Sequence, residues 1–253
     1  MSGLNNYQRL FSDPEVGTAL INTLIFTIIA VPCAIALSLL IAVLLNQKIR
    51  GLTVYRTLYF LPAVTMPAAI AIVWRWLYNG DYGLINYVLG LFSIHGPRWD
   101  TDPHIALFAL TVVAIWSYVG TNMILFLAGL QGIPKTYYEA AALDGSGPWR
   151  TFFRITLPML SPTIFFASVV SLVTAFQIFD LVYLMFGPST TGGSSTTNIA
   201  ILSTETVVYL FYKHAFTLDN QGYAAAIAML LFVIILIVTA IQFRLQRRWV
   251  YYS

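Results

Sequence analysis

The sequence predicts an all-α membrane protein, a polytopic bundle of helices, and three observations lead to this fold class. Of its 253 residues, 58% are hydrophobic and only 9% are charged, whereas a soluble domain carries about 25% charged residues. The mean hydropathy is +0.77. Five segments with at most one charge each are long enough to cross a bilayer, which takes about 20 apolar residues. So few charges cannot cover a soluble surface, which excludes a soluble enzyme and a disordered chain.

Each of the five predicted spans rests on its own stretch of sequence. The first holds no charge over a length of about 40 Å as a helix. The second contains Pro62 and Pro67, and the fourth contains one acid, Asp180. All five are predicted to be helices, because proline within a span is tolerated where neighbouring helices satisfy the freed carbonyls. The spans cover about residues 19–45, 57–78, 105–130, 159–184 and 223–243.

The remaining composition excludes several kinds of site. One cysteine, Cys33, cannot form an internal disulfide or a cysteine-based zinc or iron–sulfur site. The histidines His95, His104 and His214 are scattered without metal-ligand spacing, so no metal site is expected. The net charge of +3 is too small to indicate a nucleic-acid partner.

Lysine and arginine are divided unequally between the two sides of the predicted spans. Nine lie in the connections 46–56 and 131–158 and in the C-terminal tail, and three lie on the opposite side together with seven acids. Cytoplasmic connections are enriched in Lys and Arg, so we expect the N-terminus outside and the C-terminus in the cytoplasm. The polar residues 1–18 then follow an upstream membrane helix that is absent from this sequence, or form a short tail that crosses unaided.

The connection 131–158 is long and carries signals for local structure. Pro134 suits the first position of a helix, helix formers follow as far as Asp144, and residues 145–148 break the helix. A second short helical run, residues 149–156, comes before the next span. We expect two short helices at an angle, with Tyr137, Ala140, Ala141 and Asp144 on one face of the first. That face permits close approach of another protein, or the loop packs on its own bundle.

Seven positions in this connection resemble the EAA loop of permeases from ATP-binding-cassette (ABC) importers: Glu139, Ala140, Ala141, Gly145, Ile155, Leu157 and Pro158. Further segments are similar to the carbohydrate branch of that family, whose members import oligosaccharides, maltose-type sugars or glycerol 3-phosphate; they include Asn6-Tyr7, Phe60-Leu61-Pro62, residues 81–86, residues 128–134 and residues 179–183. The resemblance implies the type I ABC importer permease fold and a single permease domain over residues 1–253. It also implies that the family's usual first helix is missing here.

The resemblance also implies partners and a role for the loop. In the family the EAA loop is a coupling helix that docks on the ATP-hydrolysing subunit, which implies this role for Glu139, Ala140, Ala141, Asp144 and Gly145. ATP and magnesium are then held by a dimer of partner subunits, and this chain binds no cofactor. The other implied partners are a second, different permease subunit, an external or periplasmic solute-binding protein, a sugar and the lipid of a bacterial inner membrane. The sequence contains no P-loop, so the chain is not expected to hydrolyse ATP itself.

Polar side chains inside spans mark a pathway by default. In the fourth span Val173, Phe176, Gln177 and Asp180 fall at i, i+3, i+4 and i+7, on one face of a continuous helix. The ring, amide and carboxylate on that face would suit a sugar, although Asp180 could instead be solvated or pair with Arg75.

The third span offers a second polar face, formed by Ser117, Tyr118 and Thr121. Helix–helix hydrogen bonding is an equal alternative for such small polar residues. In maltose-type relatives the sugar contacts come from these same two helices, which favours the pathway for both faces.

Two other functions compete with an importer subunit. A secondary solute transporter would need ion-coupling charges in its spans and usually an inverted repeat, and a membrane-embedded enzyme would need a nucleophile–base or metal set. The sequence shows neither set. Gly187–Thr197, rich in Gly, Ser and Thr, is expected to be a flexible external loop that contacts a binding protein or serves as a plain linker.

Overall fold

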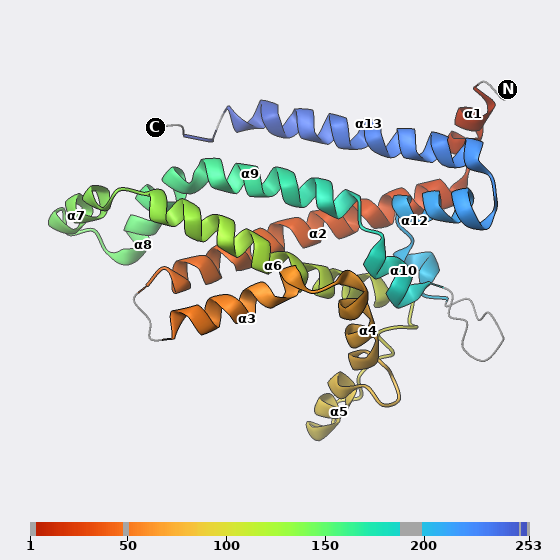
Figure 1. Cartoon of the computed structure of the whole chain (residues 1–253), viewed down its shortest axis with the longest axis horizontal. Coiled ribbons are helices and arrows are strands. Elements are labelled where there is room, and N and C mark those ends of the chain that lie inside the picture. The colour runs from red at the N-terminus through yellow and green to blue at the C-terminus, as the bar shows by residue number, and fades with distance from the viewer. Residues whose placement is uncertain (1–3, 48–50, 188–198, 248, 252–253) are drawn as a thin grey trace. The chain divides into compact units, whose positions relative to one another are not determined.

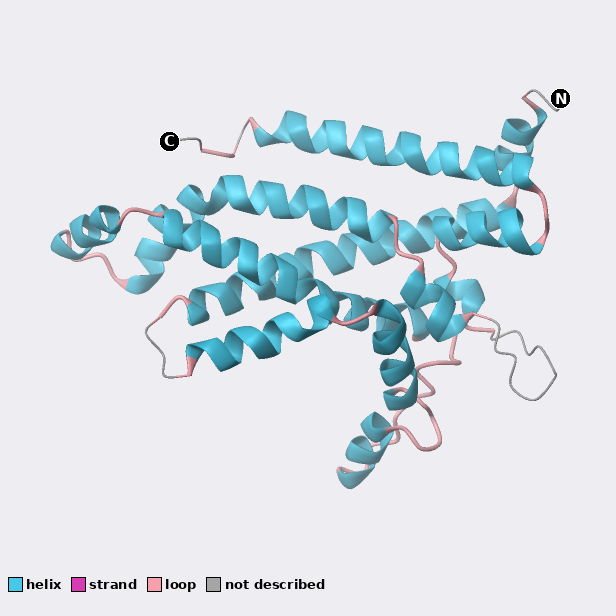
Figure 2. Cartoon of the chain, in the orientation of Figure 1, coloured by secondary structure: helices cyan, strands magenta, loops and turns pink. Residues whose placement is uncertain are grey.

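The structure, a computed structural model, describes residues 4–47, 51–187, 199–247 and 249–251 (Figure 1). The predicted loop Gly187–Thr197 lies outside these ranges from residue 188 onward, as do Lys48, Arg50 and Arg248. Every regular element in the described part is a helix (Figure 2). The elements are α1 (Asn5–Ser12), α2 (Pro14–Leu45), α3 (Leu52–Val64), α4 (Pro67–Leu77), α5 (Leu84–Leu91), α6 (Ala106–Gly132), α7 (Lys135–Leu143), α8 (Pro148–Thr151), η1 (Phe152–Thr156), α9 (Leu157–Phe176), α10 (Asp180–Phe186), α11 (Ile201–Thr204), α12 (Val207–Tyr212), η2 (Lys213–Thr217) and α13 (Gln221–Gln246).

The all-α membrane fold is confirmed. Four helical runs among the described residues are long and apolar enough to cross a membrane, and α3 with α4 makes a fifth if that bent pair is one span. The helices α2, α6 and α13 match three predicted spans and extend each by a few residues. Contacts divide the chain into two compact units. Unit 1 holds residues 1–30, 65–114 and 173–236, and unit 2 holds residues 31–64, 115–172 and 237–253.

The second predicted span is not one continuous helix. It breaks after Val64, and α4 starts at Pro67. The ring of a proline disfavours helical geometry in the residue before it, and Met66 accordingly takes φ −57° and ψ 129°. Pro67 therefore ends one helix and begins the next, whereas Pro62 is accommodated inside α3.

The fourth predicted span is also interrupted. The helix α9 ends at Phe176, residues 177–179 are not helical, and α10 begins at Asp180. The carbonyl of Ile178 within this break accepts a hydrogen bond from the hydroxyl of Thr206 at 3.1 Å. The backbone carbonyl of Ile178, which has no partner within a helix, is therefore satisfied by a side chain from another part of the chain.

Unit 2 has an apolar core built from α2, α6 and α9, around Met123, Phe126 and Leu160. Glycine permits a close approach of α6 and α9, because a Cβ on Gly129 would lie 2.6 Å from the Cδ1 of Leu160.

Pro162 in α9 leaves the carbonyl of Pro158 without its helical partner, and the Ser161 hydroxyl donates to that oxygen at 2.6 Å. The same hydroxyl accepts a hydrogen bond from the backbone nitrogen of Tyr251 at 3.0 Å. Ser161 thus satisfies the carbonyl that Pro162 leaves free, and it also holds Tyr251 against α9.

Unit 1 has a separate apolar core between α1, α2, α12 and α13. Tyr223 lies fully buried in it and donates its hydroxyl hydrogen to Asp13 at 2.7 Å. The guanidinium carbon of Arg9 lies 4.3 Å from the centre of the same ring. These contacts fasten the short helix α1 to the start of α13.

Candidate functional site

The loop 131–158 contains the predicted first helix but not a separate second one. The helix α7 follows Pro134, which occupies the position just before the helix rather than its first turn. The second run begins at Pro148 and continues through a wider π turn, Phe152–Thr156, directly into α9. In a regular α-helix the ring of Pro158 would collide with the carbonyl of Arg154. The π turn lies immediately before that proline.

Gly145 ends α7 in a left-handed conformation, with φ +67°. The nitrogen of Gly145 donates to Ala142 and that of Ser146 donates to Ala141, at 3.1 and 2.9 Å. These two bonds form the Schellman motif, which favours glycine at this position. A Cβ on Gly145 would meet no atom within 4 Å, so the glycine is required by the backbone conformation and not by close packing of neighbouring atoms.

The exposed face of the loop differs from the predicted face. Ala141 is buried, whereas Tyr137, Glu139, Ala140 and Asp144 are exposed. The hydroxyls of Tyr138 and Thr156 lie 3.2 Å apart and connect α7 to η1.

Two large apolar side chains that the sequence analysis did not select are strongly exposed on the loop. Leu143 is 90% exposed and Trp149 is 76% exposed. The Trp149 ring stacks on Phe153, with ring centres 6.3 Å apart. The loop therefore offers an apolar surface beside its small residues.

The polar residues in the middle of α6 divide into two groups. Ser117 and Tyr118 are half-buried and Thr121 is exposed. Asn122 is buried and exchanges hydrogen bonds with the hydroxyl of Ser171 in α9, at 3.0 and 3.2 Å. Helix–helix bonding thus involves Asn122, next to the proposed face.

The Asn122–Ser171 pair leads to a prediction. Replacing Asn122 with alanine should destabilise unit 2 by about 1–2 kcal/mol, because the hydroxyl of Ser171 loses its buried partner. The amount of assembled protein in membranes should fall, while uptake per assembled complex should stay the same. Thr121→Ala is the matched control and should leave the assembled amount unchanged. Equal amounts of both variants would contradict a structural role for Asn122.

The predicted continuous face of Val173, Phe176, Gln177 and Asp180 does not form, because α9 ends at Phe176. Phe176 is only 2% exposed and lies inside unit 1, so its ring is not available to stack on a solute. Gln177 and Asp180 are exposed, on either side of the non-helical residues. The alternative pairing of Asp180 with Arg75 is not among the ion pairs of the described residues. Gln177 and Asp180 remain together near one break, but not on one helix face.

Aromatic rings that the sequence analysis did not select surround this break. Phe179 stacks on Tyr183 with ring centres 5.4 Å apart and lies 4.9 Å from the ring of Tyr212. Tyr209 and Phe216 extend the cluster from α12 and η2. Hydrogen bonding to Tyr183 raises the pKa of Tyr212. The spacing of Phe179 and Tyr183, at i and i+4, is the sequence signal for their stacking.

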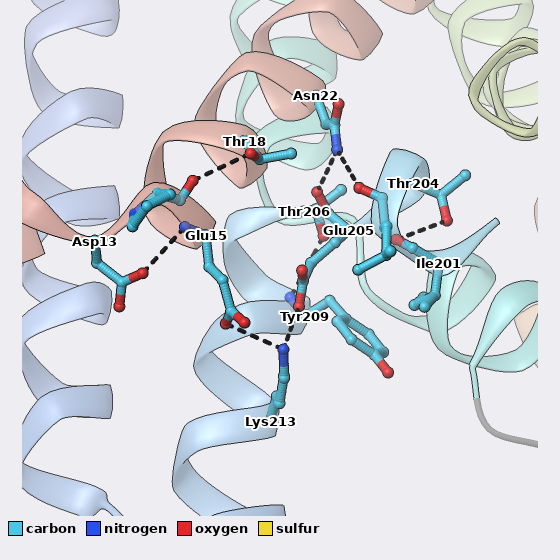
Figure 3. A network of polar contacts seen from close by, with 12 residues as sticks. Asp13, Glu15, Thr18, Asn22, Ile201, Thr204, Glu205, Thr206, Tyr209 and Lys213 are labelled. Atoms are coloured by element: carbon cyan, nitrogen blue, oxygen red, sulfur yellow. Dashed lines mark hydrogen bonds and ion pairs between the residues drawn. The ribbon is translucent and has the colours of Figure 1, made fainter. Parts of the chain in front are cut away.

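A network of polar contacts in unit 1 holds the chain on both sides of the break between α11 and α12 (Figure 3). The amide of Asn22 in α2 donates to the carbonyls of Leu202 and Glu205, at 3.4 and 3.1 Å. The hydroxyl of Thr23 accepts the backbone N–H of Val207 at 3.1 Å. The hydroxyl of Thr206, the residue after Glu205, donates a hydrogen bond to the carbonyl of Ile178. The network therefore connects the start of α2 to the break that carries Gln177 and Asp180.

Two acids share one lysine at the centre of this network (Figure 3). The Nζ atom of Lys213 lies 3.1 Å from the Oε2 of Glu15 and 3.5 Å from the Oε1 of Glu205. The side chain of Glu205 is only 5% exposed, and this burial raises the pKa of its carboxyl, with Lys213 opposing the shift. Burial alone would lower the pKa of Lys213, but the two carboxylates raise it above its usual value. The lysine therefore stays charged and compensates a buried carboxylate.

The described residues contain no group of three or more His, Cys, Asp or Glu side chains that would hold a metal ion. Beside the loop 131–158, unit 2 has an open cavity of about 300 Å³ lined by residues that include Tyr138, Thr151 and Phe152. A second open cavity, of about 400 Å³, lies around α5 in unit 1.

Comparison with known proteins relates the whole chain to membrane transport components. Residues 13–251 match the sequence family described as binding-protein-dependent transport system inner membrane component. The chain is 36% identical to the sn-glycerol-3-phosphate transport system permease protein UgpA of Pectobacterium atrosepticum, over 99% of this chain and 82% of that protein. It is also 36% identical to YesP of Bacillus subtilis, a probable ABC transporter permease protein, over 99% of this chain and 79% of that protein.

Solved structures show the same fold at lower identity. A chain of a bacterial ABC transporter involved in the import of the acidic polysaccharide alginate matches with a TM-score of 0.86 at 20% identity, covering 97% of this chain and 84% of that chain. A chain of an amino acid ABC transporter with histidines matches with a TM-score of 0.58 at 17% identity, covering 96% of this chain and 97% of that chain.

Proposed function

Because the chain belongs to the family of binding-protein-dependent transport system inner membrane components, we propose that it forms part of the membrane path of an importer for a sugar or a similar carbohydrate. The chain is a permease subunit of an ABC transporter and not an enzyme. The observation that carries the proposal is the match over residues 13–251, which includes the loop 131–158. The relative UgpA is named for a polyhydroxy compound, glycerol 3-phosphate, which supports a carbohydrate-like solute.

The proposed transport cycle needs partners. Two ATP-binding subunits hold ATP and magnesium and dock from the cytoplasm on the loop 131–158, where Glu139, Ala140 and Asp144 are exposed. A binding protein delivers the solute from the other side, and a second, different permease completes the path. ATP favours the closed form of the ATP-binding dimer, and this difference in affinity supplies the shift between inward- and outward-facing states. The distribution of Lys and Arg supports a cytoplasmic C-terminus and an external N-terminus.

Reconstitution in liposomes tests this function against the alternative of a secondary solute transporter. The complex of this chain with its second permease and its ATP-binding subunits should take up the sugar only with ATP on the side of those subunits and the binding protein on the other. Uptake that follows an ion gradient without ATP would overturn the proposal. Uptake of no carbohydrate, with ATP hydrolysis still stimulated by a binding protein carrying another solute, would refute only the substrate class.

Gln177 gives a test of the solute path. Its side chain is exposed near the break after α9, so Gln177→Ala should leave assembly intact. Loss of a hydrogen bond to a sugar hydroxyl costs about 1–3 kcal/mol, which is roughly five- to hundredfold in affinity. Uptake per assembled complex should fall by that order at solute concentrations that do not saturate the system. Leu172→Ala, earlier in α9, is the control and should not change it. Unchanged normalised uptake in Gln177→Ala would remove this residue from the path.

A further inference from the structure

The short helix α5 exposes an apolar face. Leu84, Tyr87, Val88 and Leu91 fall at i, i+3, i+4 and i+7, which places them on one side of the helix. They are 46%, 67%, 45% and 68% exposed, and Phe92, which follows the helix, is 71% exposed. From Tyr82 to Pro97 the sequence holds no Lys, Arg, Asp or Glu. A contiguous exposed apolar surface of this kind marks an interaction site.

A polar anchor on the other side fixes the rotation of α5. The amide of Asn86 donates to the carbonyls of Gly80 and Pro97, at 3.2 and 3.0 Å, and its oxygen accepts the indole N–H of Trp99 at 2.8 Å. A Cβ on Gly96 would lie 2.1 Å from that oxygen, so only glycine leaves room for the anchor. Asn86 therefore turns inward and satisfies its amide within the protein, which leaves Tyr87 and Val88 facing outward.

The neighbouring helix α4 also exposes apolar side chains. Ile72, Val73 and Trp76 of α4 are 65%, 54% and 52% exposed, and α5 contacts α4 within unit 1. Tryptophan and tyrosine at the end of a membrane span are typical of the boundary between lipid and water. Charge appears only at the two ends of the uncharged stretch, where Asp81 and Arg98 form an exposed ion pair at 3.2 Å.

We propose that α5 lies in the membrane–water interface beside the end of α4, with Leu84, Tyr87, Val88 and Leu91 in contact with lipid. Eight residues of helix are about 12 Å long, too short to cross the bilayer, but sufficient to lie in its surface. Lipid fits this face better than a protein partner, because protein interfaces carry about one hydrogen bond per 100–200 Å². Among the four side chains of this face, only the Tyr87 hydroxyl is polar. The segment between α4 and α6 is then partly a membrane anchor.

Site-directed spin labelling tests this placement in the assembled complex in liposomes. Cys33 is an exposed free cysteine and is first replaced by serine, in a complex whose other subunits lack reactive cysteine. Tyr87→Cys and Leu91→Cys are then labelled with a nitroxide, and His104→Cys, exposed in the following segment, is the matched control. Labels at 87 and 91 should collide more with oxygen, which concentrates in lipid, than with a water-soluble nickel chelate. The label at 104 should show the opposite preference.

The remaining outcomes overturn the proposal in distinguishable ways. Labels at 87 and 91 that collide mainly with the nickel chelate place α5 in water. Immobile labels that neither reagent reaches place it against protein, and repeating the measurement with and without binding protein identifies that partner. Neither result bears on the proposed transport function, because uptake by the labelled complexes is measured separately.

Discussion

Replacing Gly145 with valine is expected to lower ATP-driven uptake about tenfold or more while the protein still reaches the membrane. The backbone there has φ +67°, a conformation that costs an L-residue roughly 1–2 kcal/mol, and more when the residue is β-branched. A difference of 1.4 kcal/mol is tenfold in population, so few loops would keep the conformation that ends α7. We expect the partner subunits to continue hydrolysing ATP without transport. The measurement is the ratio of sugar taken up to ATP hydrolysed.

Gly145→Asn is the control for this experiment. Asparagine adopts the left-handed region far more readily than valine, and the space around the missing Cβ is open to both. Uptake by the asparagine variant should therefore stay close to that of the unmodified protein. If valine and asparagine behave alike, the backbone conformation of this loop has no part in coupling.

Removing the shared cation should have the largest effect on the stability of unit 1. Lys213→Met leaves the carboxylate of Glu205 buried without its partner. Breaking a buried ion pair from one side costs about 3–5 kcal/mol. Since the side chain of Lys213 is 30% exposed, solvent screens part of this cost, and we expect a loss of about 2 kcal/mol. The midpoint of thermal unfolding of the purified complex should fall accordingly.

The double variant Lys213→Met/Glu205→Gln removes both charges and should recover most of the lost stability. The pH dependence gives an independent check. Because the pKa of Glu205 is raised above its ordinary 4.5, the folded protein favours the protonated carboxyl, and this contribution to stability is lost as the pH rises through the folded pKa. The deficit of Lys213→Met should therefore be largest at neutral pH and shrink as the pH falls and Glu205 takes up a proton. A deficit independent of pH would show that lost packing, not charge, is responsible.

The long apolar helices were predictable, and their interruptions only in part. Uninterrupted apolar runs predict α2, α6 and α13 as helices, because a segment in lipid must form the hydrogen bonds of its backbone N–H and C=O groups within itself. Pro67 is a local signal for the break before α4, although proline inside spans is also tolerated. The break after Phe176 has no such signal, because Gln177-Ile178-Phe179 contains neither proline nor glycine. The hydroxyl that bonds the carbonyl of Ile178 comes from Thr206, 28 positions away and just before α12.

The candidate site was predictable where it depends on local sequence. The loop motif predicted the helix α7 and its end at Gly145, because both depend on residues that are close together in the sequence. The ion pair of Lys213 with Glu15 joins residues 198 positions apart, so sequence order could not reveal it. The pair of Lys213 with Glu205 depends on how the chain folds at the break before α12. Asn22 is a different case. A buried amide in an otherwise apolar span is itself a signal for an interior polar contact, and it would have identified the network at its α2 end.

The continuous run from Pro148 through η1 into α9 has a mechanical consequence. In unit 2 the chain has non-helical joints at residues 133–134 and 144–147, one on each side of α7, and none from residue 148 to residue 172. The helix α7 is thus joined to the rest of unit 2 by two non-helical segments and by the contact between Tyr138 and Thr156, whereas α8 is continuous through η1 with α9. A displacement of α8 would therefore pass to α9 through continuous helix, whereas a displacement of α7 would have to pass through a non-helical segment or through its contact with η1. If the ATP-binding subunits dock on this loop as proposed, the segment that carries Trp149 offers them the contact that is continuous with α9.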